Sequence, residues 1–256
     1  MGFRTNEIVI DDKNIPSNYD GLKIVHFTDI HYNRAINIKK IKDIVKEINL
    51  INPDIVVFTG DLIDKDVTLT NKDYDELTNT LKDIKTKYGK YAILGNHDYK
   101  NKDKVINVFA LSNFIYLDNS SDIIYNENNE AIFIGGLSSL TYNEADINKV
   151  MSYFDNHDDI SYKIILAHEP DITKDITTNY QVNLILAGHS HGGQIRLPLI
   201  GALYTPPYSK EYYEGHYKIN DTNLYISSGI GVSTVNYRLW NRPSINFYRL
   251  YKETSN

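Results

Sequence analysis

Five short, mainly apolar runs occur along the chain, and each ends abruptly in polar residues. They occupy residues 23–27 (KIVHF), 54–59 (DIVVFT), 91–94 (YAIL), 162–167 (YKIILA) and 183–187 (NLILA). Runs of this length are typical of strands that are buried on both faces of a sheet. The pattern therefore predicts five buried strands.

The segments between these runs repeat apolar residues with the period of a helix. The first stripe stops before Pro53, as a helix does, and consists of Ile38, Ile41, Ile44, Val45 and Ile48. Three further stripes consist of Leu77, Leu81 and Ile84, then Val105, Val108, Phe109 and Leu111, and finally Ile147, Val150, Met151 and Phe154. Strands that alternate with helices predict an α/β layered fold.

Two other stretches, residues 121–140 and 194–251, alternate in a way that favours antiparallel strands. We therefore expect one central sheet, or two packed sheets, with helices outside and β-rich additions late in the chain. The sequence shows no internal repeat, no low-complexity linker and no break in composition. Residues 1–256 are accordingly predicted to form a single domain.

Charge and cysteine content narrow the classes of function. The chain has a net charge of −6 and no block of Lys or Arg, so we expect no stable nucleic-acid partner. It has no cysteine, which leaves His, Asp, Glu, Asn and water as metal ligands. It contains neither a run of about 20 apolar residues nor a signal-peptide core. These features predict a cytoplasmic protein and leave peripheral attachment to a membrane open.

The most informative feature is the group of polar residues directly after each apolar run. The five runs lead in turn to Asp29 and His31, to Asp61 and Asp64, to Asn96, His97 and Asp98, to His168, and to His189 and His191. Any one of these residues could cap a helix or make a turn. Ligands of α/β sheets, however, bind outside the carboxyl ends of the strands. Five such endings together predict a functional site at one edge of the sheet.

The residue types fit a pair of metal ions. We expect the first ion to be held by Asp29, His31, Asp61 and His191, and the second by Asp61, Asn96, His168 and His189. Asp61 is a carboxylate and would bridge the two. Nitrogen and oxygen ligands without sulfur suit two divalent ions of Mn, Fe or Zn. Two such ions and two carboxylates leave a charge of about +2, which attracts a phosphate.

His97 is a histidine near the expected metals that has no ligand role. A hydroxide bridging two metals can attack phosphorus, and the leaving oxygen then needs a proton. His97 is the candidate acid for that proton. Asp64 is the preferred partner to hold its ring and favour its charged form, and Asp98 is the alternative.

In this order, the motifs resemble the signature of the calcineurin-like metallophosphoesterase superfamily. The pattern Asp-x-His, Gly-Asp-x-x-Asp, Gly-Asn-His-Asp, a lone His and Gly-His-x-His runs from Asp29 to His191. The resemblance implies a four-layer α/β/β/α sandwich, here with a β-rich C-terminal extension of the sheets, and the metal and acid roles given above. Residues 188–198 and 225–231 are similar to the YkuE/YaeI-type phosphodiesterase branch. That branch includes enzymes that cleave the pyrophosphate of UDP-2,3-diacylglucosamine, and many of its members have an N-terminal membrane anchor.

We therefore expect a binuclear metal-dependent phosphoesterase. Its small phosphorylated substrate would contain a phosphodiester or pyrophosphate bond, as in a UDP-diacylglucosamine-like or another nucleotide or lipid compound. Lys65 stands where protein phosphatases of the superfamily have an Arg, which argues against a phosphoprotein phosphatase. A phosphomonoesterase and a non-catalytic binding scaffold are the alternatives.

The C-terminal part is rich in aromatic residues. Nine Tyr and Trp240 lie between Tyr204 and Tyr251. They could line an amphipathic pocket for a sugar, a base or an acyl chain, but strand packing is the favoured explanation. The basic residues in the region that could contact a diphosphate are Arg196, Lys210, Arg238 and Arg242. Only Arg196 comes closely after a ligand loop, and the others are expected to be surface charges.

Overall fold

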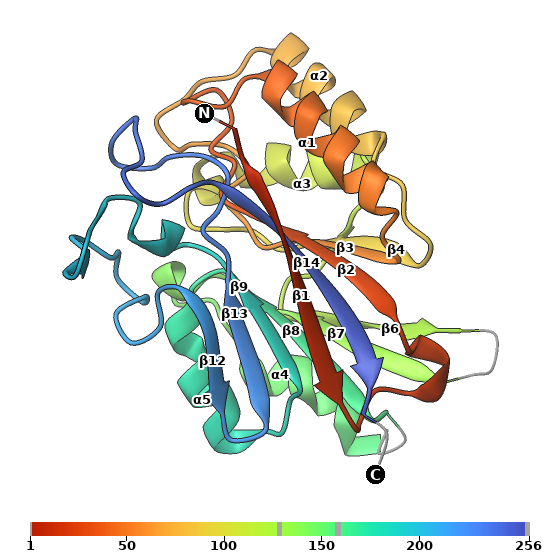
Figure 1. Cartoon of the computed structure of the whole chain (residues 1–256). Helices are drawn as coiled ribbons and strands as arrows, with labels where there is room; N and C mark the ends of the chain where they lie inside the picture. The colour runs from red at the N-terminus through yellow and green to blue at the C-terminus, as the bar shows by residue number, and fades with distance from the viewer. Residues whose placement is uncertain (1, 127–129, 157–159, 254–256) are drawn as a thin grey trace.

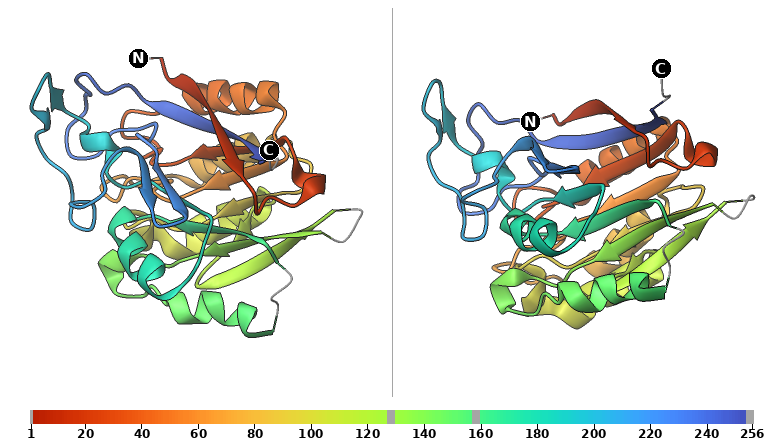
Figure 2. Two further views of the ribbon diagram at one scale, coloured as in Figure 1. Left: turned by 60° about the horizontal axis from the view of Figure 1, so that its bottom comes forward. Right: turned by 90° about the horizontal axis from the view of Figure 1, so that it is seen from below.

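Two six-stranded sheets are stacked face to face, with helices on both outer faces (Figure 1). The computed structural model describes residues 2–126, 130–156 and 160–253. Viewed along the layers, α1 lies on one side of the paired sheets and α4 on the other (Figure 2). The expected four-layer α/β/β/α sandwich is confirmed.

The first sheet has the strand order β1-β14-β2-β3-β4-β5. Its strands are β1 (Arg4–Asp12), β2 (Leu22–Phe27), β3 (Ile55–Phe58), β4 (Gly89–Ala92), β5 (Ile115–Tyr116) and β14 (Ser244–Lys252). Strands β2 to β5 are parallel, whereas β14 is antiparallel to β2 and parallel to β1. The carboxyl ends of β2, β3 and β4 therefore meet at one edge of this sheet.

The second sheet has the order β12-β13-β9-β8-β7-β6. Its strands are β6 (Ser120–Tyr125), β7 (Ala131–Gly136), β8 (Tyr162–Ala167), β9 (Leu184–Ala187), β12 (Gly215–Ile219) and β13 (Thr222–Ile226). Strands β7, β8, β9 and β13 are parallel, and the two outer strands are antiparallel to their neighbours. A small antiparallel hairpin, β10 (Arg196–Leu197) and β11 (Gly201–Ala202), stands apart from both sheets.

The helices divide between the two outer faces. Helices α1 (Ile38–Ile51), α2 (Asn71–Lys82) and α3 (Lys102–Leu111) pack on the first sheet, and α4 (Ile147–Met151) and α5 (Thr173–Asn179) on the second. Helix α1 begins where the Asn37 side chain accepts a hydrogen bond from the Lys40 amide, and Thr70 and Asp73 form a capping box at α2. Among the helices of the described residues, none is long and apolar enough to cross a membrane.

Alternating side chains of each buried strand enter different layers of the core. In β2, Ile24 packs between the two sheets, whereas Val25 packs under the helices. In β8, Ile164 faces the space between the sheets and Ile165 faces α4 and α5. Both faces of these strands are thus covered, which is why the runs are apolar without alternation.

The predicted elements are largely confirmed. The runs at 23–27, 54–59, 162–167 and 183–187 form β2, β3, β8 and β9. The four helical stripes correspond to α1 to α4, except that α2 ends before Ile84 and α4 ends before Phe154, which lies in a 3-10 helix. The run at 91–94 forms β4 two residues earlier than expected, because Ile93 and Leu94 continue into the core after the strand has ended. The expected antiparallel pairs occur as β6–β7 and β12–β13.

Candidate metal centre

Hydrogen bonds between the loops after the strands hold those loops together. The Asp29 amide donates to the Gly60 carbonyl at 2.9 Å, and the His31 amide donates to the Asp61 carbonyl at 3.1 Å. On the second sheet, the Gly188 amide donates to the His168 carbonyl at 3.1 Å. The His189 amide donates to the Asp29 carboxylate and the His97 amide to that of Asp61, so the five strand ends form one cluster of loops.

Two glycines allow the loops to approach this closely. Gly60 has φ +98°, and a Cβ atom there would overlap the backbone of Gly95. A Cβ atom on Gly95 would overlap the carboxylate of Asp61. The glycines that precede Asp61 and Asn96 in the sequence motifs are therefore required by close packing.

The first group of candidate ligands combines residues that follow strands of both sheets. His31 Nε2 is 3.0 Å from His191 Nε2, and His191 Nε2 is 3.5 Å from Asp29 Oδ1. Asp61 Oδ2 lies 3.5 Å from His31 Nε2. All four side chains are buried.

The second group shares Asp61 with the first. Asp61 Oδ2 is 3.3 Å from His168 Nε2, which is in turn 3.2 Å from Asn96 Oδ1. The ring of His189 lies 5.0 Å from that of His168, centroid to centroid. Its Nε2 donates to the Pro207 carbonyl at 2.8 Å, so Nδ1 is the nitrogen left for a metal.

These distances fit divalent ions. Ligand bonds of about 2.1 Å place neighbouring ligand atoms of one octahedral ion about 3.0 Å apart. Three groups of described residues have ligand atoms close enough to surround an ion, namely Asp29, His31 and His191; His31, Asp61 and His97; and Asp29, Asp61 and His168. All seven residues predicted as ligands lie in this region, and His97 belongs to one of the three groups.

Backbone strain is concentrated in the same residues. Five of the expected ligands have positive φ angles, namely Asp29 (53°), His31 (46°), Asp61 (57°), His189 (66°) and His191 (50°). Such conformations cost about 1–3 kcal/mol each and persist where the surrounding structure imposes them. The strain indicates that the fold holds these side chains in place for a function.

Acceptors behind the rings fix their orientation. His168 Nδ1 donates to the Thr59 carbonyl at 2.6 Å, and His31 Nδ1 donates to Asp64 Oδ2 at 3.1 Å. In both rings Nε2 is therefore the nitrogen that faces the candidate metals. Outer partners of this kind hold metal-binding histidines in a single tautomer.

Behind His191 the partner is a buried cation rather than an acceptor. A guanidinium nitrogen of Arg238 lies 2.9 Å from His191 Nδ1, Arg238 Nε donates to the Gly231 carbonyl at 2.8 Å, and Asn241 donates to the His191 carbonyl. Burial lowers the pKa of Arg238 to about 10, although the charge of Asp29 opposes this shift. Arg238 was expected to be a surface charge. That expectation is wrong, because the side chain is only 6% exposed.

Asp64 contacts both His97 and Arg34. It is fully buried, and its Oδ2 lies 3.5 Å from His97 Nδ1. The same oxygen is 3.2 Å from a guanidinium nitrogen of Arg34. The carboxylate of Asp98, the alternative partner, instead accepts the backbone amides of Ile63 and Gly95. The contacts thus favour Asp64 as the partner of His97.

Charge shifts the pKa values of this pair in opposite directions. Burial opposes protonation of His97, but the negative charges of Asp61 and Asp64 outweigh it and raise the pKa of His97. Burial also opposes ionisation of Asp64, but hydrogen bonds from His31 and His97 outweigh that effect and lower its pKa. The metal-free protein therefore favours a protonated His97 beside an ionised Asp64.

Arg34 is a site residue that the sequence analysis missed. It lies three residues after His31, and no local pattern distinguishes it from an ordinary loop cation. Its guanidinium contacts Asp64 and also bonds to Asn236 and to the Thr234 carbonyl. Arg34 thus connects the loop that contains Thr234 and Asn236 to the candidate metal centre.

The centre opens into a pocket of about 780 Å³. Asp61, Asn96, His97, His189 and His191 lie at its polar end. Its other walls are more apolar and include Ile195, Leu203, Tyr204, Pro206, Pro207, Tyr208 and Val235.

The aromatic and basic residues of the late chain have different environments. Tyr204 and Tyr208 line the pocket, whereas Tyr225 and Tyr248 pack in the core between the sheets. Both explanations of the aromatic residues therefore hold, each for some of them. Arg196 is outside this pocket and forms an ion pair with Glu214.

Metal binding is expected to release a proton from His168. Its Nδ1 faces a carbonyl and its Nε2 faces two oxygens, so both nitrogens are placed to donate. Burial opposes protonation, but the charges of Asp61 and Asp29 outweigh it and hold the pKa of His168 well above its ordinary value.

At neutral pH the ring is thus charged without metal, and a metal at Nε2 must displace about one proton. The affinity for Mn²⁺ should accordingly rise with pH. Calorimetric titration of the metal-free protein in two buffers of different ionisation enthalpy measures the proton. Equal binding enthalpies in both buffers would contradict the prediction.

Comparisons with known proteins find similar sequences and a similar fold. Residues 22–193 match the family model described as calcineurin-like phosphoesterase. The chain is 34% identical over 250 residues to the uncharacterised metallophosphoesterase YkuE of Bacillus subtilis, covering 97% of this chain and 85% of that protein. It is 25% identical to phosphodiesterase YaeI of Escherichia coli, covering 89% and 82%. The crystal structure of calcineurin-like phosphoesterase YfkN from Bacillus subtilis superimposes with a TM-score of 0.51, at 14% identity and 82% coverage of each chain.

Proposed function

The chain belongs to the calcineurin-like phosphoesterase family, and on that premise we propose that it hydrolyses a phosphodiester or pyrophosphate bond. Membership of this family makes the protein a metal-dependent phosphoester hydrolase. The proposal concerns the type of bond and the residues that act on it. The name of the relative YaeI, a phosphodiesterase, supports it.

The observation that carries the proposal is the convergence of ligand atoms on both sides of Asp61. In the proposed assignment, Asp29, His31, Asp61 and His191 hold one divalent ion, and Asp61, Asn96, His168 and His189 hold the second. Separations of 3.0–3.5 Å between ligand atoms support the first set and, in the second, Asp61, Asn96 and His168, while His189 is assigned from its ring contact with His168. The donor set suits Mn, Fe or Zn.

When bound, the ions would supply positive charge for the phosphate and acidify a water molecule. The remaining steps fall to the chain. His97 lines the pocket and protonates the leaving oxygen, and Asp64 holds its ring through Nδ1 so that Nε2 faces the substrate. The hydrogen bonds between the loops hold these groups in position, in spite of the strained backbone conformations.

The pocket favours a diester over a monoester. Among the cationic side chains of its lining, Arg34 is already engaged by Asp64, Asn236 and Thr234 and His97 is paired with Asp64, which leaves Lys65. Little charge beyond the metals is left for the dianion of a monoester. The apolar walls instead offer room for a second substituent on phosphorus.

Comparing two nitrophenyl substrates tests this preference. The Mn²⁺-loaded protein is expected to hydrolyse bis-p-nitrophenyl phosphate with a kcat/KM at least about tenfold above that for p-nitrophenyl phosphate, since about 1.4 kcal/mol of pocket contact is enough. A preference for the monoester would indicate a phosphomonoesterase. No turnover of either substrate by protein that contains two metals per chain would indicate a binding scaffold.

A further inference from the structure

Two loop segments beside the candidate metal centre carry most of the exposed large apolar side chains. These rim segments are residues 195–210 and 233–243. Within the described part of the chain, eight of the fourteen such side chains belong to them, namely Leu199, Ile200, Leu203, Tyr204, Tyr208, Tyr237, Leu239 and Trp240. Scattered apolar residues are normal on a protein surface, but a contiguous group of this kind marks an interaction site.

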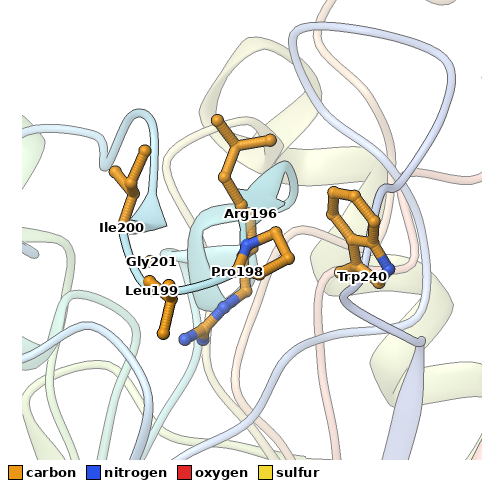
Figure 3. Close-up of a pocket in the computed structure, with 7 residues that line it drawn as sticks. Arg196, Pro198, Leu199, Ile200, Gly201 and Trp240 are labelled. Carbon is orange, nitrogen blue, oxygen red and sulfur yellow. The ribbon is translucent and has the colours of Figure 1, made fainter.

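The rim segments lie side by side. The Arg196 amide donates to the Leu239 carbonyl at 3.0 Å, and the Leu239 amide donates to the Gln194 carbonyl at 3.2 Å. Trp240 faces the β10–β11 hairpin across a hollow of about 550 Å³ (Figure 3). Both segments project from the same end of the sandwich (Figures 1 and 2). They therefore form one continuous surface.

Two of the exposed apolar side chains belong to residues with strained backbone conformations. Leu199 is fully exposed with φ +67°, and Trp240 is 65% exposed with φ +49°. Bulky residues seldom adopt the left-handed region, where Gly and Asn are favoured. A strained turn that points Leu or Trp into water has no benefit for folding, which indicates that these side chains have a partner.

The charge of the rim segments indicates the kind of partner. They contain no Asp or Glu, although the chain has 33 acidic residues, and they contain Arg196, Lys210, Arg238 and Arg242. Arg242 and Lys210 are exposed. Arg238 is buried and Arg196 pairs with Glu214, so Arg242 and Lys210 carry the free charge of this surface. Exposed Leu, Ile, Tyr and Trp side chains beside free basic residues are complementary to an anionic lipid surface.

The position of the surface also favours lipid over a protein partner. The inner sides of the same segments, at Ile195, Leu203, Tyr204 and Tyr208, line the pocket above the metal ligands. A protein bound over the rim would cover the mouth through which substrate must pass. A lipid surface would leave the pocket open toward the molecules that it presents. We propose that the rim segments dock this protein on an anionic lipid surface.

Trp240 is the only tryptophan of the chain, so its fluorescence reports on this surface directly. The probes are vesicles of phosphatidylcholine with one quarter phosphatidylglycerol, and vesicles of phosphatidylcholine alone. We expect the emission of Trp240 to shift to the blue and the protein to sediment with the anionic vesicles, less so at high salt. No shift and no sedimentation with either vesicle would overturn the proposal. Equal binding to both vesicles at any salt would also overturn it.

Asn substitutions test the surface without straining the backbone, because Asn tolerates positive φ. Leu199→Asn keeps the fluorophore and is expected to weaken vesicle binding at least about tenfold. The double variant Leu199→Asn/Trp240→Asn lacks the fluorophore, and sedimentation should show that it binds vesicles about 10²-fold more weakly. Leu50→Asn, at a side chain of α1 that is 70% exposed, is the matched control and should bind like the unmodified protein. Equal losses in the control and the rim variants would count against a specific surface.

Two further measurements separate this proposal from its rivals. Leu199 and Trp240 lie outside the pocket above the metals, so the variants should hydrolyse bis-p-nitrophenyl phosphate normally. Vesicle binding by a protein without turnover would disprove only the proposed function. A dimer that the double substitution converts to monomer, without vesicle binding, would assign the surface to a second copy of the chain and overturn the lipid assignment.

Discussion

Replacement of Asp61 by asparagine is expected to remove the metal ions and to lower phosphodiester hydrolysis by about 10³-fold or more. Asp61 lies between the two groups of ligands, 3.5 Å from His31 Nε2 and 3.3 Å from His168 Nε2. A single substitution at this position therefore affects both proposed metal sites. Loss of the ions removes several kcal/mol of charge stabilisation in the transition state, and each 1.36 kcal/mol is a factor of ten in rate.

The backbone determines the orientation of the new amide. Asp61 Oδ1 accepts the amide hydrogen of His97 at 2.8 Å. An asparagine must keep its carbonyl oxygen at this position, because its NH₂ group would otherwise oppose another donor. The NH₂ group is thereby turned toward His31 and His168, where it cannot bind a metal. The substitution thus exchanges the bridging ligand for a donor while leaving the volume unchanged.

Metal analysis by plasma mass spectrometry and a hydrolysis assay measure the outcome. Asp54→Asn is the matched control. It removes the same charge at a position just before β3, the strand that leads to Asp61. There, one carboxylate oxygen of Asp54 accepts a hydrogen bond from the Lys23 amide. That variant should retain both ions and full activity. If Asp61→Asn also retained two ions per chain, Asp61 would not be the bridge.

Much of the fold could be predicted from the sequence because the buried strands are short, apolar and bounded by polar residues. The run at 162–167 coincides with β8, and its two-sided burial explains the unbroken apolar pattern. The predicted helices were likewise marked by stripes that the structure largely buries, although Leu111 at the end of α3 is exposed. Local patterns of this kind depend only on which faces of an element are covered.

Elements with weak local patterns were not predicted. Strand β1 is mostly exposed and is defined by its parallel pairing with β14, which begins as Arg4 opposite Ser244. In helix α5 only Thr173 and Ile176 are buried, and the residues around them are polar. Pairing between distant segments and burial of one or two side chains leave no periodic signal in the sequence.

The same distinction applies to the candidate site. The ligand-type residues could be predicted because each comes after a recognisable strand, and parallel strands bring their carboxyl ends to one edge. Arg34 and Arg238 could not. Arg34 is one cation in a polar loop, and Arg238 reaches His191 from 47 residues later in the chain. Their roles depend on how loops fold over the site, which short motifs do not encode.

Replacement of His97 by alanine is expected to lower turnover by about 10²–10⁴-fold for a substrate with an alkyl leaving group, with both metal ions retained. The reason is the contact of His97 Nδ1 with Asp64, which favours the charged ring beside the pocket. Because the acid must be protonated, activity of the unmodified protein should fall as the pH rises above the pKa of His97. The variant should lose this alkaline decline. His216→Ala, at an exposed histidine that bonds to Asn223, is the control and should leave turnover unchanged.

The leaving group distinguishes an acid from a metal ligand at this position. His97 belongs to a group with His31 and Asp61 whose atoms are close enough to share an ion, so ligation is the rival explanation. An alkoxide leaving group needs a proton, whereas p-nitrophenolate is stable without one. An acid role therefore predicts that the defect of His97→Ala is large for a dinucleotide and small for bis-p-nitrophenyl phosphate. A ligand role predicts loss of metal and an equal defect for both substrates, and that result would remove His97 from the acid role and place it among the ligands.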